Sequence, residues 1–169
     1  MTNTDPITFI GQYLKSCELT YEQSGPDTFV ITLPGEHKLQ TNMSLTVGSH
    51  AITINAFVSR NPEENHEGVY RWLLERNRRM YAVSFSIDHL GDIYLTGRIP
   101  LNSITSAELD RVLGSVLEYS DGAFNTILEL GFAASIKREW AWRISRGEST
   151  ANLAAFAHLT EVDQSRGPN

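Results

Sequence analysis

Residues 72–98 constrain the fold of this chain more than any other stretch, because two kinds of periodicity follow one another there. An apolar helical segment that contains Trp72 runs into a cluster of arginines. From Tyr81 to Ile99, apolar side chains then recur at every second position on both sides of the turn 88–92. This alternation around a turn rich in Asp and Gly is typical of a β-hairpin with one buried face. A buried face needs a cover, so the pattern predicts a sheet packed against helices.

The segments before residue 72 predict a helix followed by more strands. Asp5 and Pro6 form a helix start, and the apolar stripe that follows ends at Cys17, which we therefore expect to be buried. Apolar and polar side chains alternate in three runs, residues 29–33, 39–47 and 52–58. Leu39 is the first apolar residue of the second run. Together they predict an antiparallel meander with one wet face.

The segments after the hairpin predict helices that cover it. Residues 105–108 match a capping box, in which Thr105 accepts from free amides and Glu108 reaches back. A long apolar stripe follows as far as Gly131, with a bend or weak point expected at residues 121–122. A second helix is predicted over 133–146, and a short last helix within 149–159. The fold class predicted from the residues is therefore α+β, an antiparallel sheet with helices packed on it.

Length, charge and composition narrow the class of protein. A chain of 169 residues most simply forms one domain, to which we assign residues 1–159, and residues 160–169 are expected to form a frayed polar tail. The formal charge of −6 argues against nucleic-acid binding, which depends on neutralising phosphates. There is no apolar run long enough for a membrane span and no signal-like N-terminus, so we expect a cytoplasmic protein without a membrane partner.

Motifs for catalysis or cofactor binding are not found in the sequence. It has no phosphate-binding loop, no dinucleotide-binding glycine pattern, no nucleophile elbow and no zinc-protease helix motif. Asp88, His89 and Asp92 could ligate a metal, but Asp and Gly are also what a hairpin turn requires, and we favour the turn. We therefore assign no catalytic, cofactor-binding or metal-ligating residues and expect no cofactor.

The helix over residues 67–77 is apolar on two sides, which suggests an interface. Val69 and Trp72 mark one side, while Tyr70 and Leu74 mark the other. One sheet can cover only one side of a helix, so the second side is expected to form a homodimer interface. The alternative within a monomer is that the long helix ending at Gly131 covers it.

Two clusters of arginine and a polar sheet face are the other candidate binding surfaces. Arg78 and Arg79 belong to the first cluster, and the second cluster interleaves arginines with tryptophans: Arg138, Trp140, Trp142 and Arg143. Arginine and tryptophan are enriched in protein interfaces, but we favour the alternative of a solvated helix face with one core tryptophan over a binding patch. Arg98 lies on the polar face of the 81–99 hairpin, where it could hold an anion for a small ligand or substrate. The alternative there is a wet sheet face.

The sequence resembles the YbjN-type bacterial sensory transduction regulator family in four segments: Arg76-Asn-Arg-Arg-Met-Tyr81, Gly91-Asp-Ile-Tyr-Leu-Thr-Gly-Arg-Ile-Pro100, Phe124-Asn-Thr-Ile-Leu-Glu-Leu-Gly-Phe132, and Lys137-Arg-Glu-Trp-Ala-Trp-Arg143 with Arg146-Gly-Glu-Ser-Thr150. The resemblance implies a fold similar to type III secretion chaperones, often paired as a dimer. The predicted helices after Gly131 go beyond this minimal fold. The family has no agreed biochemical activity and no catalytic residues to transfer. The resemblance therefore implies a non-enzymatic protein-binding or regulatory module with a protein partner.

Overall fold

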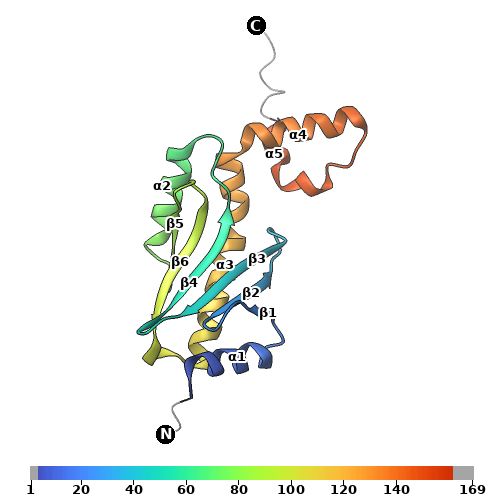
Figure 1. Cartoon of the computed structure of the whole chain (residues 1–169). Coiled ribbons are helices and arrows are strands. Elements are labelled where there is room, and N and C mark those ends of the chain that lie inside the picture. The colour runs from blue at the N-terminus through green and yellow to red at the C-terminus, as the bar shows by residue number, and fades with distance from the viewer. Residues whose placement is uncertain (1–3, 162–169) are drawn as a thin grey trace.

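The computed structural model describes residues 4–161 as a six-stranded sheet with helices. The strands are β1 (Thr20–Gln23), β2 (Thr28–Pro34), β3 (Gln40–Val47), β4 (Ala51–Ser59), β5 (Val83–Ile87) and β6 (Ile93–Pro100). The helices are α1 (Pro6–Ser16), α2 (His66–Asn77), α3 (Ser106–Gly131), α4 (Ala133–Arg146) and α5 (Ala157–Glu161), with 3₁₀ turns η1 (Leu101–Ser103) and η2 (Ala151–Phe156). All strand pairs are antiparallel, in the order β1-β2-β3-β4-β6-β5 (Figure 1). This confirms the predicted α+β fold class.

The predicted hairpin is formed by β5 and β6, with its apolar side chains aligned on one face. Phe85 lies opposite Leu95, and β6 continues the sheet into β4. The chain enters β5 through a tight turn at Ala82, whose φ is 62°. A Cβ on Gly97 would lie 2.1 Å from the carbonyl oxygen of Ala82. Only a residue without a side chain fits at position 97.

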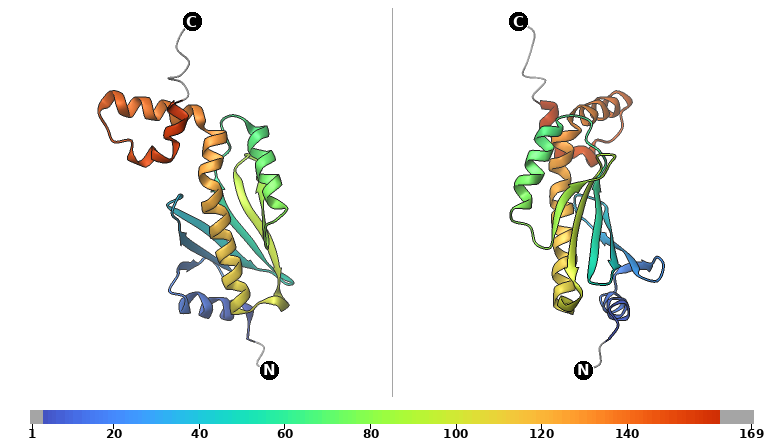
Figure 2. Two further views of the ribbon diagram at one scale, coloured as in Figure 1. Left: turned by 180° about the vertical axis from the view of Figure 1, so that it is seen from behind. Right: turned by 60° about the vertical axis from the view of Figure 1, so that its left-hand side comes forward.

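Helices α1, α2 and α3 cover the apolar face of the sheet (Figure 2). The Tyr13 hydroxyl of α1 donates to Asp110 near the start of α3. The opposite face of the sheet carries polar side chains such as Thr53 and Asn55, which are exposed. A buried stripe runs along α3: Leu109, Val112, Leu113, Val116, Ser120, Ala123, Ile127 and Gly131. This stripe and the inner faces of the strands form one hydrophobic core.

The start of α3 follows the capping pattern only in part. Thr105 is the N-cap, and its hydroxyl accepts from the backbone N–H of Glu108 at 3.1 Å, as predicted. The Glu108 carboxylate does not reach back to the cap. It accepts from the Tyr81 hydroxyl and from Arg111 instead, because the turn before β5 lies within its reach.

The predicted bend or weak point at residues 121–122 lies within one unbroken helix, α3, where Asp121 has a tertiary role. Its Oδ1 accepts the backbone N–H groups of Glu36, His37 and Lys38 at 2.9, 2.9 and 3.0 Å. The loop comes so close that a Cβ on Gly35 would lie 2.4 Å from Asp121 Oδ1. Burial alone would raise the pKa of Asp121, but these backbone donors and the His37 ring outweigh it and hold the pKa below its ordinary value.

Four residues predicted to lie on buried faces are at the surface: Cys17, Leu39, and the two ends of the first hairpin run, Tyr81 and Ile87, which are 40% and 50% exposed. Cys17 is exposed because α1 ends at Ser16, and Glu18, with φ of 55°, turns the chain away. Leu39 is 88% exposed. It precedes the first residue of β3 and belongs to the loop that Asp121 holds, so it never enters the alternation of the strand.

The helices after Gly131 form a unit that extends beyond the end of the sheet (Figures 1 and 2). Gly147 ends α4 with φ of 68°, the left-handed conformation that glycine commonly adopts after the last helical residue. The chain then returns through η2 and α5, where Phe156 is buried and His158 contacts Glu129 of α3. The predicted short last helix is thus a 3₁₀ turn followed by one α-helical turn. Of the predicted tail 160–169, residues 162–169 lie outside the described part of the chain.

Candidate protein-binding site

Helix α2 has one buried face and one exposed apolar face. Val69 and Leu73 are buried against the core, whereas Leu74 is 64% exposed. Tyr70, one turn before Leu74, is half-buried beside the His66 ring at a centroid distance of 5.9 Å. Although α3 packs beside α2, it leaves Leu74 uncovered, so the second apolar side of α2 is available to another molecule.

An open groove of about 910 Å³ lies between α2, the segment leading to β5, and the middle of α3. Apolar and aromatic side chains line part of it, and charged side chains line the rest. The apolar and aromatic group is Trp72, Met80, Phe85, Tyr119 and Ala123, with Gly122, and the charged group is Glu75, Arg76, Arg78, Arg79 and Glu118. We call this surface the α2–α3 groove. It is large enough for several side chains of a ligand.

Several contacts fix the walls of the α2–α3 groove. The Asn77 side chain brackets the edge strand β5: the Phe85 N–H donates to Asn77 Oδ1 at 2.7 Å, and Asn77 Nδ2 donates to the Phe85 carbonyl at 3.1 Å. The Tyr119 hydroxyl accepts from the Tyr81 N–H at 2.9 Å. The guanidinium of Arg76 stacks over Trp72, 4.4 Å from the ring centroid. The groove is therefore held by backbone and ring contacts and does not depend on surface side chains alone.

Arg78 and Arg79 are exposed, and neither has an ion-pair partner within residues 4–161. Other arginines nearby are engaged: Arg71 with Glu67 at 3.4 Å and Arg111 with Glu108 at 3.3 Å. Guanidinium groups without a partner offer two donors in a fixed geometry that suits a carboxylate. The groove thus carries available cations at its rim.

The second predicted cluster lies elsewhere and is partly structural. The groove uses the middle of α3, whereas α4 starts at its C-terminal end. The Arg143 guanidinium donates hydrogen bonds to the Glu139 carboxylate at 2.7 Å and to the Ser149 carbonyl at 3.0 Å. Trp140 is half-buried, and Trp142 is 47% exposed beneath the guanidinium of Arg146. The structure does not join this cluster to the α2–α3 groove.

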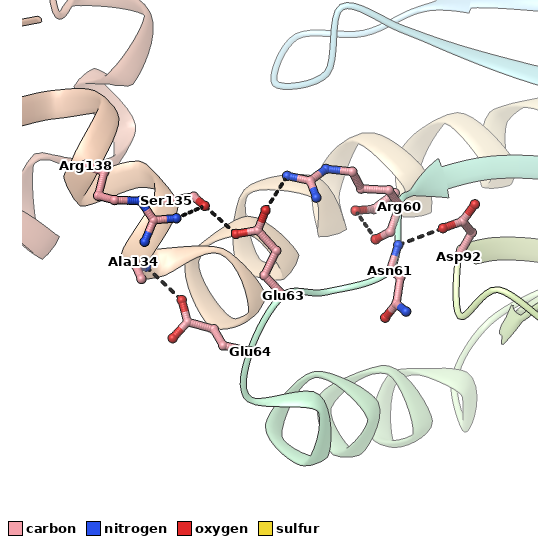
Figure 3. Close-up of polar contacts among 9 residues, drawn as sticks. Arg60, Asn61, Glu63, Glu64, Asp92, Ala134, Ser135 and Arg138 are labelled. Carbon is pink, nitrogen blue, oxygen red and sulfur yellow. Dashed lines mark hydrogen bonds and ion pairs between the residues drawn. The ribbon is translucent and has the colours of Figure 1, made fainter. Parts of the chain in front are cut away.

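Arg138 belongs to a junction that sequence analysis missed, at the start of α4 (Figure 3). Glu63 accepts from Arg60 at 2.8 Å and from the Ser135 hydroxyl, which in turn accepts from Arg138 at 2.9 Å. These hydrogen bonds hold the pKa of Glu63 below its ordinary value, the Ser135 bond contributing most. The whole network links the loop before α2 with the first turn of α4.

The same loop caps α4, which has no side-chain cap of its own. Glu64 Oε1 accepts the Ala134 N–H at 2.7 Å (Figure 3). The N–H groups of Glu63 and Glu64 donate to the Gly131 carbonyl at 2.9 and 3.2 Å. A Cβ on Gly131 would lie 2.9 Å from Pro62, so glycine permits this close approach. The sequence signal was only two consecutive glutamates in a polar loop, 70 residues before their target.

The polar face of the hairpin is the open face of the sheet. Ser84 and Arg98 are exposed, and the Ser86 and Thr96 hydroxyls pair with each other at 3.0 Å. Tyr94 packs edge-on against Phe57 at 5.5 Å between centroids. These contacts are those of neighbouring strands on a solvated face, and they favour the wet-face alternative over a ligand site around Arg98.

Asp88 and Asp92 serve the hairpin turn. Asp88 Oδ1 accepts the N–H groups of Leu90 and Asp92, and Asp92 Oδ1 accepts the Asn61 N–H at 2.8 Å.

Within residues 4–161, no three His, Cys, Asp or Glu side chains are grouped so that they could hold a metal ion. In the same part of the chain, no helix is long and apolar enough to cross a membrane.

The sheet and the helices packed on it form an α+β fold similar to that of type III secretion chaperones. One chain in the crystal structure of the ExsC–ExsE complex is similar to this chain, with a TM-score of 0.53 and 16% identity, covering 73% of this chain and 97% of that one. One chain in the structure of the HopA1–SchA chaperone–effector complex is also similar, with a TM-score of 0.52 and 11% identity, covering 72% and 97%. At these identities the likeness concerns the fold.

The chain belongs to the YbjN family, described as "Putative bacterial sensory transduction regulator", whose model matches residues 6–129. YbjN from E. coli has a similar crystal structure, with a TM-score of 0.53 and 11% identity over 70% of this chain and 87% of that one. These findings confirm the resemblance noted in the sequence.

Uncharacterized mycobacterial proteins are much closer in sequence. One from Mycobacterium leprae (strain TN) is 56% identical over 153 residues, which is 88% of this chain and 83% of that protein. One from Mycobacterium tuberculosis (strain H37Rv) is 52% identical over 166 residues, covering 94% and 91%. The family model ends at residue 129, inside α3, so α4 and α5 lie beyond it. The second relative leaves only about 6% of the chain unmatched, so its similarity includes α4.

Proposed function

We propose that this protein is a non-enzymatic, cytoplasmic protein-binding module, chaperone-like or regulatory, that works as a homodimer. The observation that carries the proposal is the apolar face of α2 formed by half-buried Tyr70 and exposed Leu74, next to a groove whose Arg78 and Arg79 have no ion-pair partner within residues 4–161. Structural neighbours that include a chaperone–effector complex support a role in binding proteins. The heterodimeric ExoU–SpcU complex of a type III secretion system adds the same support, with a TM-score of 0.51.

Assembly through α2 follows from the physics of an uncovered helix face. Leu74 keeps most of its side chain in water, and burying such a side chain stabilises by about 1.5–3 kcal/mol. In a twofold interface, Leu74 and Tyr70 of each subunit pack against the same face of the partner. Two Leu74 side chains are then buried, and the stabilisation is doubled. In the dimer that we propose, α2 and the adjoining hairpin lie close to the twofold axis.

The assembly is tested by sedimentation of the unmodified protein and of a variant carrying Tyr70→Glu and Leu74→Glu. We expect a dimer at micromolar concentration for the first and a folded monomer for the second. A control with Gln12→Glu and Ala141→Glu adds two carboxylates at exposed helix positions and should remain dimeric. The single variant Leu74→Glu is measured as well, so that loss of the dimer is not confused with unfolding caused by a charge at the half-buried Tyr70. An unmodified protein that sediments as a monomer would contradict the homodimer.

Protein binding itself is tested by affinity capture from a native cell extract, with the unmodified protein as bait. We expect a specific partner whose recovery falls when Tyr70 and Leu74 are charged. An activity screen with small molecules runs alongside on the same preparation. Recovery of no specific partner together with turnover of a small molecule would overturn the non-enzymatic, protein-binding assignment.

A further inference from the structure

The α2–α3 groove lies on a different side of α2 from the proposed dimer interface. Successive residues of a helix are about 100° apart around its axis, so Trp72 and Arg76 lie about 40° apart. Leu74 is two positions from each of them, about 200° around the helix, and Tyr70 is likewise about 200° from Trp72. Tyr70 and Leu74 therefore lie on the opposite side of α2. Trp72 and Arg76 line the groove, while Leu74 points away from it into solvent. A partner seated in the groove therefore does not compete with a second subunit on the outer face of α2.

Building on the proposed function, we propose that the α2–α3 groove binds an acidic linear segment of a protein partner. An aromatic or aliphatic side chain of that segment packs against Trp72 and Tyr119, and its carboxylates pair with Arg78 and Arg79. Both parts of this pairing follow from the groove itself, through its apolar floor and its cationic rim.

The floor suits an apolar anchor. Phe85 is buried beneath the groove, and the Trp72 ring lies 6.5 Å from the Phe85 ring, so the two form one continuous aromatic surface. Tyr119 is oriented by its hydrogen bond with the Tyr81 backbone. Rigid aromatic walls lose little conformational entropy on binding, which is why such residues dominate the energetics of interfaces.

The rim favours carboxylates. Three guanidinium groups line the groove against the two carboxylates of Glu75 and Glu118, and no ion pair within residues 4–161 joins these acids to the arginines. A net positive rim is notable on a chain of formal charge −6. Acidic groups of a partner can also pair with Arg78 and Arg79 without any rearrangement, since both side chains are exposed and have no ion pair within residues 4–161.

The same charge pattern disfavours nucleic acid. A phosphate backbone needs a run of cations, whereas here two carboxylates interrupt the rim and the whole chain is acidic. A short acidic peptide can place its carboxylates at Arg78 and Arg79 and keep clear of Glu118. The partner is therefore a protein segment in which acidic residues flank an apolar anchor.

The test is fluorescence anisotropy with three labelled short peptides and the full-length protein. The first has a central Trp-Leu pair flanked by glutamates, the second replaces the glutamates by lysines, and the third replaces the Trp-Leu pair by glycines. We expect the first to bind at least about tenfold more tightly than either control. Its affinity should also fall as salt is raised, because the pairs at the rim are exposed.

Substitutions in the groove and outside it test where the first peptide binds on the protein. Arg78→Glu with Arg79→Glu should reduce affinity for the first peptide at least about tenfold, and lysine at both positions should lose less because it keeps the charge without the bidentate geometry. The control is Arg71→Glu, an exposed position on α2 outside the groove, which should bind as the unmodified protein does. Equal binding of the lysine peptide, or no effect of the double reversal in a protein that unfolds at its usual temperature, would overturn the proposal.

Two further readouts separate this proposal from the proposed function. If the double reversal at Arg78 and Arg79 converts a dimer to a monomer in sedimentation, the groove holds a second copy of the chain and the acidic-segment proposal is wrong. If affinity capture recovers the same partner with the unmodified protein and with the double reversal, protein binding stands and the groove assignment fails. Loss of that partner together with loss of the acidic peptide supports both.

Discussion

Replacing Asp121 by alanine is the most informative test of how the sheet is fastened to α3. The carboxylate accepts three backbone N–H groups at 2.9–3.0 Å from the loop 36–38. Each hydrogen bond to a charged group contributes about 1.5–3 kcal/mol, but the freed donors of Glu36 and His37 are exposed and water can replace the carboxylate there. We therefore expect Asp121→Ala to lower the free energy of unfolding by about 2–4 kcal/mol.

Asp121→Asn separates charge from geometry. The amide keeps an oxygen where Oδ1 accepts, so the backbone hydrogen bonds survive in their weaker, neutral form, and the loss should be about half that of alanine. Urea unfolding followed by circular dichroism measures both variants at neutral pH. Glu118→Ala, an exposed position on the same helix with no hydrogen bond or ion pair to another residue in the part of the chain that the structure describes, is the matched control.

The pH dependence gives a second, independent check on Asp121. Its pKa is depressed in the folded state, so its contribution to stability is present above the unfolded pKa of about 3.9 and is lost as the pH falls through the folded pKa. The difference between the unmodified protein and Asp121→Asn should therefore be constant near neutral pH and shrink below about pH 4. Alanine and asparagine variants that both unfold within about 0.5 kcal/mol of the unmodified protein would refute the reasoning.

Three other substitutions test separate parts of the fold. Gly97→Ala should cost about 3 kcal/mol or more in urea unfolding, because its Cβ would meet the Ala82 carbonyl; a cost below about 1 kcal/mol would contradict that contact. Gly114→Ala should add about 0.5–1 kcal/mol, since a Cβ there meets nothing within 4 Å on an exposed helix surface, and a loss of stability would show that α3 is strained there. Glu64→Ala should remove the cap of Ala134, worth about 0.5–2 kcal/mol. Faster hydrogen exchange confined to the first turn of α4 would confirm this cap, and unchanged exchange would argue against it.

The periodicity of the sequence determined the elements and the core of this protein. Alternation between apolar and polar residues predicted strands β2 to β6, although not the short β1, and the spacing of Leu109, Val112 and Val116 predicted α3, because burial on one face is a local property of the pattern. The same argument found Leu74 as an apolar residue that the sheet could not cover. The arginines at 78 and 79 were also visible in the sequence.

Only the tertiary structure shows which of these elements contact one another. Tyr119 and Phe85 complete the α2–α3 groove from segments more than 30 residues apart along the chain, and nothing in either segment signals the other. Asp121 looked like a weak point of a helix because its partners lie about 85 residues earlier. Glu64 caps α4 across 70 residues. Such contacts depend on how the layers pack in three dimensions, whereas periodicity records only which side of an element is buried.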